Sequence, residues 1–127
     1  MIKFALVGCG RISKRHSELL GDGQIKDAKL VAVCDKSEKK ANVIGRKYDI
    51  PVFTCMHEMM KSQAIDVVVI LTESGLHAQH TIELAEYGAH IMVEKPMALR
   101  LEDADNMISA CDRHKIKLFV AIILLWF

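Results

Sequence analysis

The chain has 127 residues, of which 51% are hydrophobic and 26% are charged, and its formal net charge is +1. This length and composition suit one folded domain with its own core and exclude a disordered chain. A net charge near zero, without a basic run, gives no electrostatic footprint for nucleic acid or an anionic membrane. The longest apolar run, residues 118–127, is shorter than the roughly 20 residues that span a bilayer. Because no secretory signal is present, we expect a soluble, cytoplasmic protein without nucleic-acid or membrane partners.

Four cysteines are spread along the chain, at positions 9, 34, 55 and 111. No two of them form the C-x-x-C spacing of zinc sites, so the sequence predicts no metal centre. We expect all four thiols to be reduced and mostly buried as small apolar side chains, in a reducing compartment.

The first predicted strand covers residues 2–7 and runs directly into a turn that contains Gly8 and Gly10. Gly8 would let the chain reverse sharply, and the missing side chain of Gly10 would let a pyrophosphate approach the backbone. A helix predicted over about residues 11–20 would direct its free N–H groups and the positive end of its dipole at that phosphate. The motif prefers glycine or alanine where this chain has Ser13, a small residue that we expect the packing to tolerate.

A second predicted strand, residues 30–34, ends on Asp35. A carboxylate at this place can accept hydrogen bonds from the adenosine ribose hydroxyls and repels a 2′-phosphate, which predicts a preference for NAD over NADP. Lys36 stands beside this carboxylate and would weaken the preference. The strand, glycine turn, helix, strand and acid together predict a dinucleotide-binding site. The alternative is an ordinary glycine turn of an α/β protein with an unrelated aspartate.

The rest of the chain alternates between β-rich apolar runs and amphipathic stretches, the pattern of a parallel sheet flanked by helices. Further strands are predicted over residues 51–53, 65–71, 89–93 and 117–124, and further helices over residues 37–48, 56–62, 76–87 and 102–114. We therefore expect an α/β fold with a doubly wound parallel sheet, six strands in the order 3-2-1-4-5-6 and helices on both faces.

Apolar residues at helical spacing predict which side of each helix packs on the sheet. The expected inward residues are Ile12, His16, Leu19 and Leu20 in the first helix, Ala41, Ile44, Gly45 and Tyr48 in the second, Ala78, Ile82 and Ala85 in the fourth, and Leu101, Ala104, Ile108 and Cys111 in the last. We expect His16 at an interface or at the surface without a functional role, and His80 in solvent.

The predicted strand over residues 65–71 is a continuous β-branched run, so we expect it to be central and buried on both faces. Its carboxyl end, Leu71 and Thr72, would face the same crevice as the glycine turn, because ligands collect at the carboxyl ends of parallel strands. His77 stands in the first turn of the next helix. It would lie either near the crevice or exposed at the start of the helix.

The fifth predicted strand is followed directly by Glu94, Lys95 and Pro96. Charged side chains at the carboxyl end of a buried strand point to the ligand crevice. A lysine there can hold a substrate hydroxyl or a ribose and help to move a proton. Pro96 would restrain the turn and can adopt the cis form, which would help to aim Lys95. The alternative is a surface ion pair between Glu94 and Lys95.

Several of these motifs together resemble the glucose–fructose oxidoreductase/inositol dehydrogenase (Gfo/Idh/MocA) family. The motifs are Val7-Gly8-Cys9-Gly10-Arg11-Ile12, Cys34-Asp35, Leu71-Thr72 with His77 downstream, and Glu94-Lys95-Pro96-Met97-Ala98. The resemblance covers about residues 2–120 and implies a Rossmann fold in an NAD(P)-dependent dehydrogenase that oxidises or reduces a sugar or cyclitol hydroxyl. Within the family, the motifs at 71–77 and 94–98 look closest to dehydrogenases of UDP-N-acetylated aminosugar uronates.

The resemblance, with the arguments above, gives a set of candidate site residues. The candidates for cofactor binding are Gly8, Cys9, Gly10, Arg11, Ile12, Asp35, Lys36, Leu71, Thr72, His77, Glu94, Lys95 and Pro96. Lys95 is also the candidate catalytic residue, and the expected cofactor is NAD rather than NADP.

The chain also departs from the family pattern. Many members have proline where Glu73 stands, and members continue into a second α+β domain that carries most substrate contacts and a partner for the lysine. Because this chain stops at Phe127, we expect residues 1–127 to be the dinucleotide-binding domain of a longer parent. The apolar stretch 118–127 would form an uncapped edge strand that favours a homo-oligomer.

Three functions stay open at this point. The chain is the nucleotide-binding part of a sugar or nucleotide-sugar oxidoreductase with little turnover alone, or it is a module that binds NAD without chemistry. The third alternative is a self-associating remnant that binds no ligand.

Overall fold

A computed structural model describes residues 1–121 of the chain. It contains β1 (Ile2–Val7), α1 (Ser13–Gly21), β2 (Ala28–Cys34), α2 (Glu38–Tyr48), β3 (Val52–Phe53), α3 (Met56–Ser62), β4 (Val67–Ile70), the 3₁₀ turn η1 (Ser74–Leu76), α4 (His77–Leu84), the 3₁₀ turn η2 (Ala85–Tyr87), β5 (His90–Glu94), α5 (Leu101–Arg113) and β6 (Leu118–Ala121). Each predicted strand and helix is present within the described residues, with ends shifted by a few residues, and the part of the predicted strand 117–124 after residue 121 lies outside them. Within the described part, no helix has both the length and the apolar character needed to cross a membrane.

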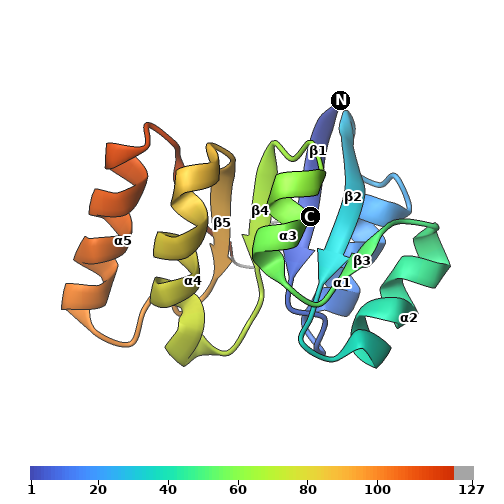
Figure 1. The fold of residues 1–127 in the computed structure, drawn as a ribbon, viewed down its shortest axis with the longest axis horizontal. Helices are drawn as coiled ribbons and strands as arrows, with labels where there is room; N and C mark the ends of the chain where they lie inside the picture. The colour runs from blue at the N-terminus through green and yellow to red at the C-terminus, as the bar shows by residue number, and fades with distance from the viewer. Residues whose placement is uncertain (122–127) are drawn as a thin grey trace.

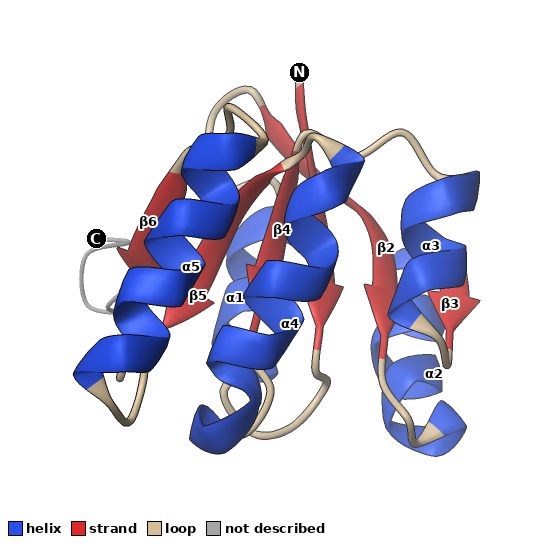
Figure 2. Cartoon of the chain, turned by 60° about the vertical axis from the view of Figure 1, so that its left-hand side comes forward, coloured by secondary structure: helices blue, strands red, loops and turns tan. Residues whose placement is uncertain are grey.

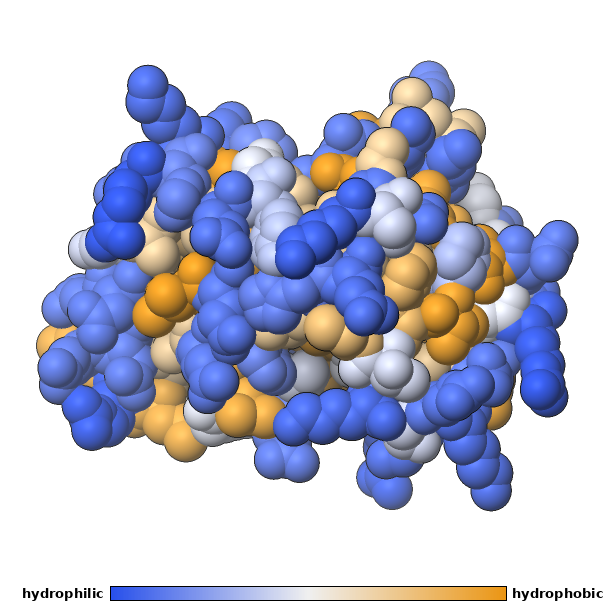
Figure 3. Space-filling view, viewed as in Figure 1, coloured by the Kyte–Doolittle hydropathy of each residue, from blue (hydrophilic) through white to orange (hydrophobic). Residues whose placement is uncertain are grey.

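The strands form one sheet of six strands in the order β3-β2-β1-β4-β5-β6, and every neighbouring pair is parallel. The predicted strand order is therefore confirmed. Helices α3, α4 and α5 lie on one face of the sheet, and α1 and α2 lie on the other (Figures 1 and 2). The outer side of α3, α4 and α5 is mainly hydrophilic, with apolar atoms only in small separate areas (Figure 3).

Each face of the sheet has its own apolar core, because successive side chains of a strand point to opposite faces. On the face of α3, α4 and α5 the buried residues include Val7, Val68, Ile70, Ile91, Val93, Met59, Leu84 and Met107. On the face of α1 and α2 they include Phe4, Leu6, Leu30, Val33, Val69, Leu20, Ala41 and Ile44. The residues of β4 are 0–9% exposed, so the predicted central strand is buried on both faces.

The inward residues were predicted correctly for α1 and α2 but only in part for the α4 region and α5, where Ala85 and Cys111 are buried as predicted. Ser37 caps α2 as its Oγ accepts a hydrogen bond from the Lys40 N–H at 3.3 Å. In α4, however, Ile82 is 41% exposed, and in α5 Leu101 and Ile108 are 81% and 46% exposed. The buried residues that the prediction missed are His77, His80, Thr81 and Leu84 of α4 and Met107 and Ala110 of α5. In α4, the polar inward residues hid the true phase from a search for apolar spacing.

The last strand, β6, pairs only with β5 among the described strands. Residues 122–127, which carry most of the segment predicted to drive self-association, lie outside the described residues.

Gly8 joins the end of β1 to the turn in a conformation that only glycine adopts easily. Its φ is +103°, and a Cβ built on it would lie 2.8 Å from the Leu71 carbonyl carbon and 2.9 Å from the Thr72 nitrogen. The backbones that follow β1 and β4 therefore approach each other more closely than any side chain permits. This close approach brings the glycine turn and Thr72 to the same edge of the sheet.

We predict that Gly8→Ala lowers the free energy of unfolding by about 3 kcal/mol, because it combines backbone strain with overlap against Leu71. Chemical denaturation measures this loss. Gly88→Ala is the matched control, since Gly88 has a φ of +83° but no atom within 4 Å of an added Cβ. Its expected loss is about 1 kcal/mol, and equal losses for the two variants would contradict the close-approach argument.

Candidate functional site

The carboxyl ends of β1, β2 and β4 border one cleft of about 620 Å³. Gly8 and Gly10 line it from the first turn, Asp35 and Lys36 from the end of β2, and Leu71 and Thr72 from the end of β4. These six lining residues were all candidates from the sequence. The cleft therefore lies at the edge where open parallel sheets bind their ligands.

The glycine turn offers unpaired backbone donors beside this cleft. The Gly8 N–H donates to the Cys34 carbonyl at 2.8 Å, and the Ser13 N–H donates to the Gly10 carbonyl at 3.1 Å. In the part of the chain that the structure describes, the N–H groups of Gly10, Arg11 and Ile12 make no hydrogen bond. Regular helix starts only at Ser13, two residues after the predicted start, so these donors belong to the turn that leads into α1.

Ser13 occupies the position where the fingerprint prefers glycine or alanine. Its side chain is only 1% exposed, and its hydroxyl donates to the Gly10 carbonyl at 2.5 Å. The buried hydroxyl thus finds a hydrogen-bond acceptor within the turn. This bond explains how serine is tolerated at a position that prefers glycine or alanine.

Asp35 links the two turns that border the cleft. One carboxylate oxygen accepts the Cys9 N–H at 2.7 Å, and the other accepts the Ser37 N–H at 2.7 Å. Each carboxylate oxygen has capacity for a second donor, so ribose hydroxyls can still bind there. The sequence predicted the ribose contact but missed this structural role, which uses the Cys9 N–H and removes it from the donors available to a phosphate.

Cys9 and Cys34, at the ends of β1 and β2, are poor nucleophiles. The Cys9 Sγ lies 3.5 Å from the Cys34 carbonyl oxygen. Burial, with a smaller effect of the Asp35 charge, raises the pKa of the Cys9 thiol from 9.0 to about 12. Burial, with a smaller effect of Cys55, raises the pKa of the Cys34 thiol to about 12 as well. All four cysteines are free, and only Cys55 is not buried.

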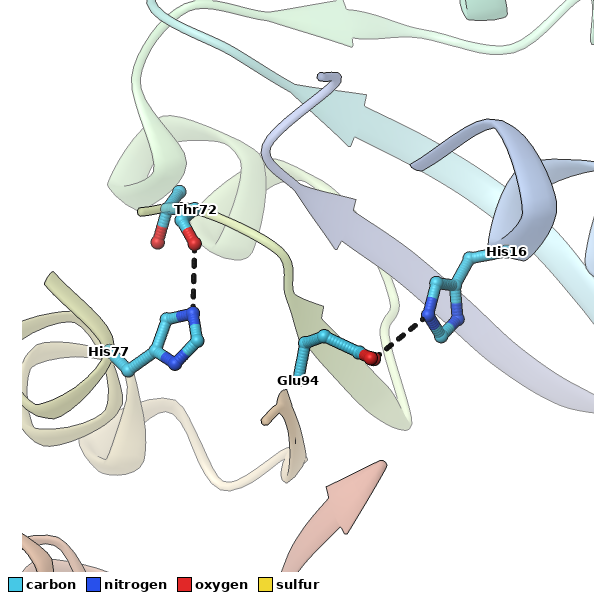
Figure 4. Close-up of polar contacts among 4 residues, drawn as sticks. All are labelled: His16, Thr72, His77 and Glu94. Carbon is cyan, nitrogen blue, oxygen red and sulfur yellow. Dashed lines mark hydrogen bonds and ion pairs between the residues drawn. The ribbon is translucent and has the colours of Figure 1, made fainter. Parts of the chain in front are cut away.

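Thr72, at the cleft wall, is held by two histidines of α4. The Thr72 hydroxyl lies 2.8 Å from Nδ1 of His80, and the Thr72 carbonyl oxygen lies 2.8 Å from Nε2 of His77 (Figure 4). His77 is 1% exposed and His80 is 8% exposed. The prediction that His80 lies in solvent is therefore wrong, as is the alternative that His77 is exposed.

Glu94 at the end of β5 pairs with His16 of α1 rather than with Lys95. The Glu94 carboxylate lies 3.2 Å from Nε2 of His16 (Figure 4). His16 is 0% exposed, so it lies at the interface of α1 with the sheet, one of the two places expected for it, and not at the surface. Burial lowers the pKa of His16, and the hydrogen bond and charge of Glu94 oppose this shift only in part. A neutral ring that donates to a carboxylate therefore describes the contact at neutral pH. Lys95 is exposed, and the Lys95–Pro96 peptide bond is cis.

The amino-acid pattern that forms this cleft matches a known family. The description "Oxidoreductase family, NAD-binding Rossmann fold" (GFO_IDH_MocA) applies to residues 2–122. The chain belongs to this oxidoreductase family. It has the family's NAD-binding Rossmann fold, with the strand order that the sequence predicted.

Solved and curated relatives of this chain include inositol dehydrogenases and a dehydrogenase solved with a nucleotide sugar. The WlbA dehydrogenase from Bordetella pertussis, solved with NADH and UDP-GlcNAcA, is 39% identical with a TM-score of 0.88, over 94% of this chain and 36% of its own. The scyllo-inositol 2-dehydrogenase (NADP(+)) IolU of Bacillus subtilis is 31% identical over 96% of this chain and 37% of its own length. The scyllo-inositol 2-dehydrogenase (NAD(+)) of the same organism is 33% identical over 81% of this chain and 30% of its length. The chain thus spans about a third of these relatives.

The structure of this family member does not bring all candidate residues into the cleft. Gly8, Gly10, Asp35, Lys36, Leu71 and Thr72 line it, whereas Cys9, Arg11, Ile12, His77, Glu94, Lys95 and Pro96 do not. Sequence reasoning missed His16 and His80. A signal existed for His16, because it lies in phase with the inward residues of its helix, but an isolated polar residue in an apolar stripe was given no weight.

The far end of the cleft has a polar cluster that the sequence did not predict. His57 lies 3.2 Å from the Glu83 carboxylate and 2.5 Å from the Tyr87 hydroxyl, and both His57 and Glu83 line the cleft. The cluster joins α3 to α4 and η2. Among the described residues, no group of three or more histidine, cysteine or acidic side chains is arranged to hold a metal ion.

We predict that stability falls on acidification because of the buried histidines. Burial lowers the pKa of both His16 and His80 in the folded chain, whereas an unfolded histidine titrates near about 6.5. Their contribution is therefore complete above about pH 6.5 and is lost as the pH falls toward the folded-state pKa, with a limiting slope of about 1.4 kcal/mol per pH unit and proton. Urea denaturation between pH 7.5 and 5.5 measures the slope.

His16→Gln is the informative variant in this series, because it removes the titrating ring while keeping an N–H donor in reach of Glu94. We expect a smaller slope than in the wild-type chain. An unchanged slope in both His16→Gln and His80→Gln would refute the assignment.

Proposed function

We propose that this chain binds NAD across the carboxyl ends of β1, β2 and β4 and is the nucleotide-binding part of an oxidoreductase for a sugar or nucleotide-sugar hydroxyl. The observation that supports the proposal is that backbone N–H groups without a hydrogen bond and a carboxylate held by the backbone lie at the same cleft. The N–H groups of Gly10, Arg11 and Ile12 fit the negative charge of a pyrophosphate, and the Asp35 carboxylate is held in place by two backbone donors.

When bound, NAD supplies the hydride acceptor or donor that exchanges a hydride with the substrate carbon. The chain's own residues would hold and orient it. The glycine turn would bind the pyrophosphate, Asp35 the adenosine ribose, and the Thr72 side of the cleft would border the nicotinamide end. Lys95 is our proposed catalytic residue, because an ammonium group at the end of β5 can stabilise a substrate alkoxide as the hydroxyl loses its proton.

The substrate class rests on the relatives rather than on a pocket within this chain. The relatives act on inositols or bind UDP-GlcNAcA, as their names state, and this chain corresponds to about a third of their length. We therefore propose that the substrate is a sugar or nucleotide sugar and that turnover requires residues equivalent to the remaining part of those relatives. The stand-alone alternative is a chain that binds NAD without chemistry.

Isothermal titration with NAD tests the proposed function. We predict that Gly10→Val reduces NAD affinity by at least about tenfold, because a branched side chain covers the donors that bind the pyrophosphate. The fold should persist, since no atom lies within 4 Å of a Cβ added at Gly10. NADP should bind more weakly than NAD, because a 2′-phosphate meets the Asp35 carboxylate.

Gly88→Ala serves as the control, since it lies away from the cleft lining. Its NAD affinity should equal that of the wild-type chain. Equal NAD affinity of wild type and Gly10→Val contradicts the proposed site. Equal affinity of the wild-type chain for NAD and NADP would instead remove only the role of Asp35.

We also propose that the chain self-associates through the outer half of the α1 side of its sheet. Met92 of β5 and Phe119 of β6 are register partners, so their side chains share one face of the sheet. Met92 packs at the edge of the core beneath α1 and α2, yet Phe119 remains 45% exposed. An exposed aromatic residue on the outermost of the described strands favours contact with a second copy.

Size-exclusion chromatography with light scattering of the full 127-residue chain tests this association. We predict a dimer or larger species, and a shift toward monomer in Phe119→Lys. Ile108→Lys is the matched control, because Ile108 is 46% exposed on α5, away from this face. A monomeric wild-type chain, or equal shifts in both variants, would contradict the proposed surface.

A further inference from the structure

Lys95 is exposed, but the residues on either side of it are each held by a buried histidine. The Glu94 side chain meets His16 of α1 at 3.2 Å, and the Pro96 carbonyl oxygen lies 2.8 Å from Nδ1 of His77 of α4. The two helices lie on opposite faces of the sheet. The backbone that carries Lys95 is therefore fixed from both faces at adjacent positions.

The contact with His16 comes from the helix that follows the glycine turn. Glu94 is 8% exposed and His16 is 0% exposed, so the bond forms away from solvent. Ile91 and Val93 of β5 belong to the core under α3, α4 and α5, and Glu94, one residue on, points to the α1 face instead. This bond ties the end of β5 to α1, the helix that follows the turn with the proposed pyrophosphate donors.

The contact with His77 comes from the helix that follows β4. Its two ring nitrogens lie 2.8 Å from the Pro96 carbonyl oxygen and 2.8 Å from the Thr72 carbonyl oxygen. Both carbonyl oxygens are acceptors, so a ring nitrogen that carries a proton donates to the carbonyl oxygen that it faces. His77 thus joins the Lys95 turn to Thr72, which lines the cleft.

We propose that His16 and His77 are positioning residues that fix Lys95 relative to the bound dinucleotide. This inference rests on the proposed function, in which Lys95 serves the reaction. Both histidines connect the Lys95 turn to elements that border the cleft, one through α1 and one through Thr72. They set where the Lys95 Cα lies relative to the pyrophosphate and the nicotinamide end, and the side chain of Lys95 reaches the substrate from that fixed point.

Packing alone does not account for these two rings. An apolar side chain of similar volume would fill either position without the cost of burying a polar ring, and such replacements are often neutral or stabilising. Hydrogen bonds to a carboxylate and to carbonyl oxygens are directional, whereas apolar contacts are not. What the two rings add is a defined direction for the chain on either side of Lys95.

Backbone ¹⁵N relaxation of the 127-residue chain without NAD tests the proposal directly. In the wild-type chain we expect the Lys95 amide to be as rigid as the strands, with an order parameter of about 0.85. In His16→Leu and in His77→Leu it should fall below about 0.6, the range of flexible backbone, while the amides of β1 and β4 keep their values.

Two further variants separate positioning from general stability. His16→Gln retains an N–H donor in reach of Glu94 and should restore the order parameter of Lys95. His57→Gln is the matched control, since His57 also hydrogen-bonds to two side chains, Tyr87 and Glu83, and neither is a neighbour of Lys95 in the chain. It should leave the Lys95 amide unchanged, whatever its effect on the free energy of unfolding.

The proposal fails if the Lys95 amide stays rigid in both leucine variants, or if His57→Gln loosens it to the same extent. If His16→Leu does not fold, Glu94→Met removes the other partner of the His16–Glu94 bond. The order parameter of the Lys95 amide in that variant then tests the proposal. NAD titration of the wild-type chain reports separately on the proposed function, because the relaxation experiment contains no cofactor. Failure of NAD binding and failure of the positioning role are therefore told apart.

Discussion

The site depends on how the backbone is satisfied where the parallel strands stop. Inside the sheet, each N–H and carbonyl of a central strand has a neighbour, but at the carboxyl ends these groups need other partners or stay available for a ligand. In this chain, some of these backbone groups bond to side chains, and others at neighbouring positions stay available for a ligand. The N–H groups of Gly10, Arg11 and Ile12 stay available, whereas the turns around them are closed by Asp35 and by His77.

The Asp35 side chain can both satisfy backbone N–H groups and accept hydrogen bonds from a ligand. Its carboxylate bonds to the N–H groups of Cys9 and Ser37 at 2.7 Å each, which fixes the glycine turn against the start of α2. Hydrogen bonds to a charged acceptor are stronger than neutral ones, so this acid can hold both turns and still present lone pairs to a ribose. A substitution of Asp35 would therefore affect both ribose binding and the conformation of the two turns.

The sequence predicted those parts of the fold that follow from backbone patterning. The apolar runs gave the strands, and the run 65–71 gave the central strand because it lacks alternation. The phase of α4 could not be predicted this way, since His77 and His80 face inward only because Thr72 and Pro96 offer them oxygen atoms. Pro96 is distant from α4 in the sequence, and Thr72 lies in the turn before it. The sequence pattern of α4 alone therefore does not reveal these acceptors.

The same reasoning explains why Lys95 was recognised while its surroundings were not. A charged residue after an apolar strand stands out in a sequence, but the partner of Glu94 lies 78 residues earlier in the chain. The alternative interpretation was a surface ion pair between Glu94 and Lys95, but the structure separates the two side chains, because Glu94 faces α1 and Lys95 follows the end of β5. That separation turns Glu94 toward His16 and leaves the Lys95 ammonium exposed. A lysine without a fixed ion pair keeps its charge available for a substrate, provided that its backbone is held by neighbours that are themselves buried.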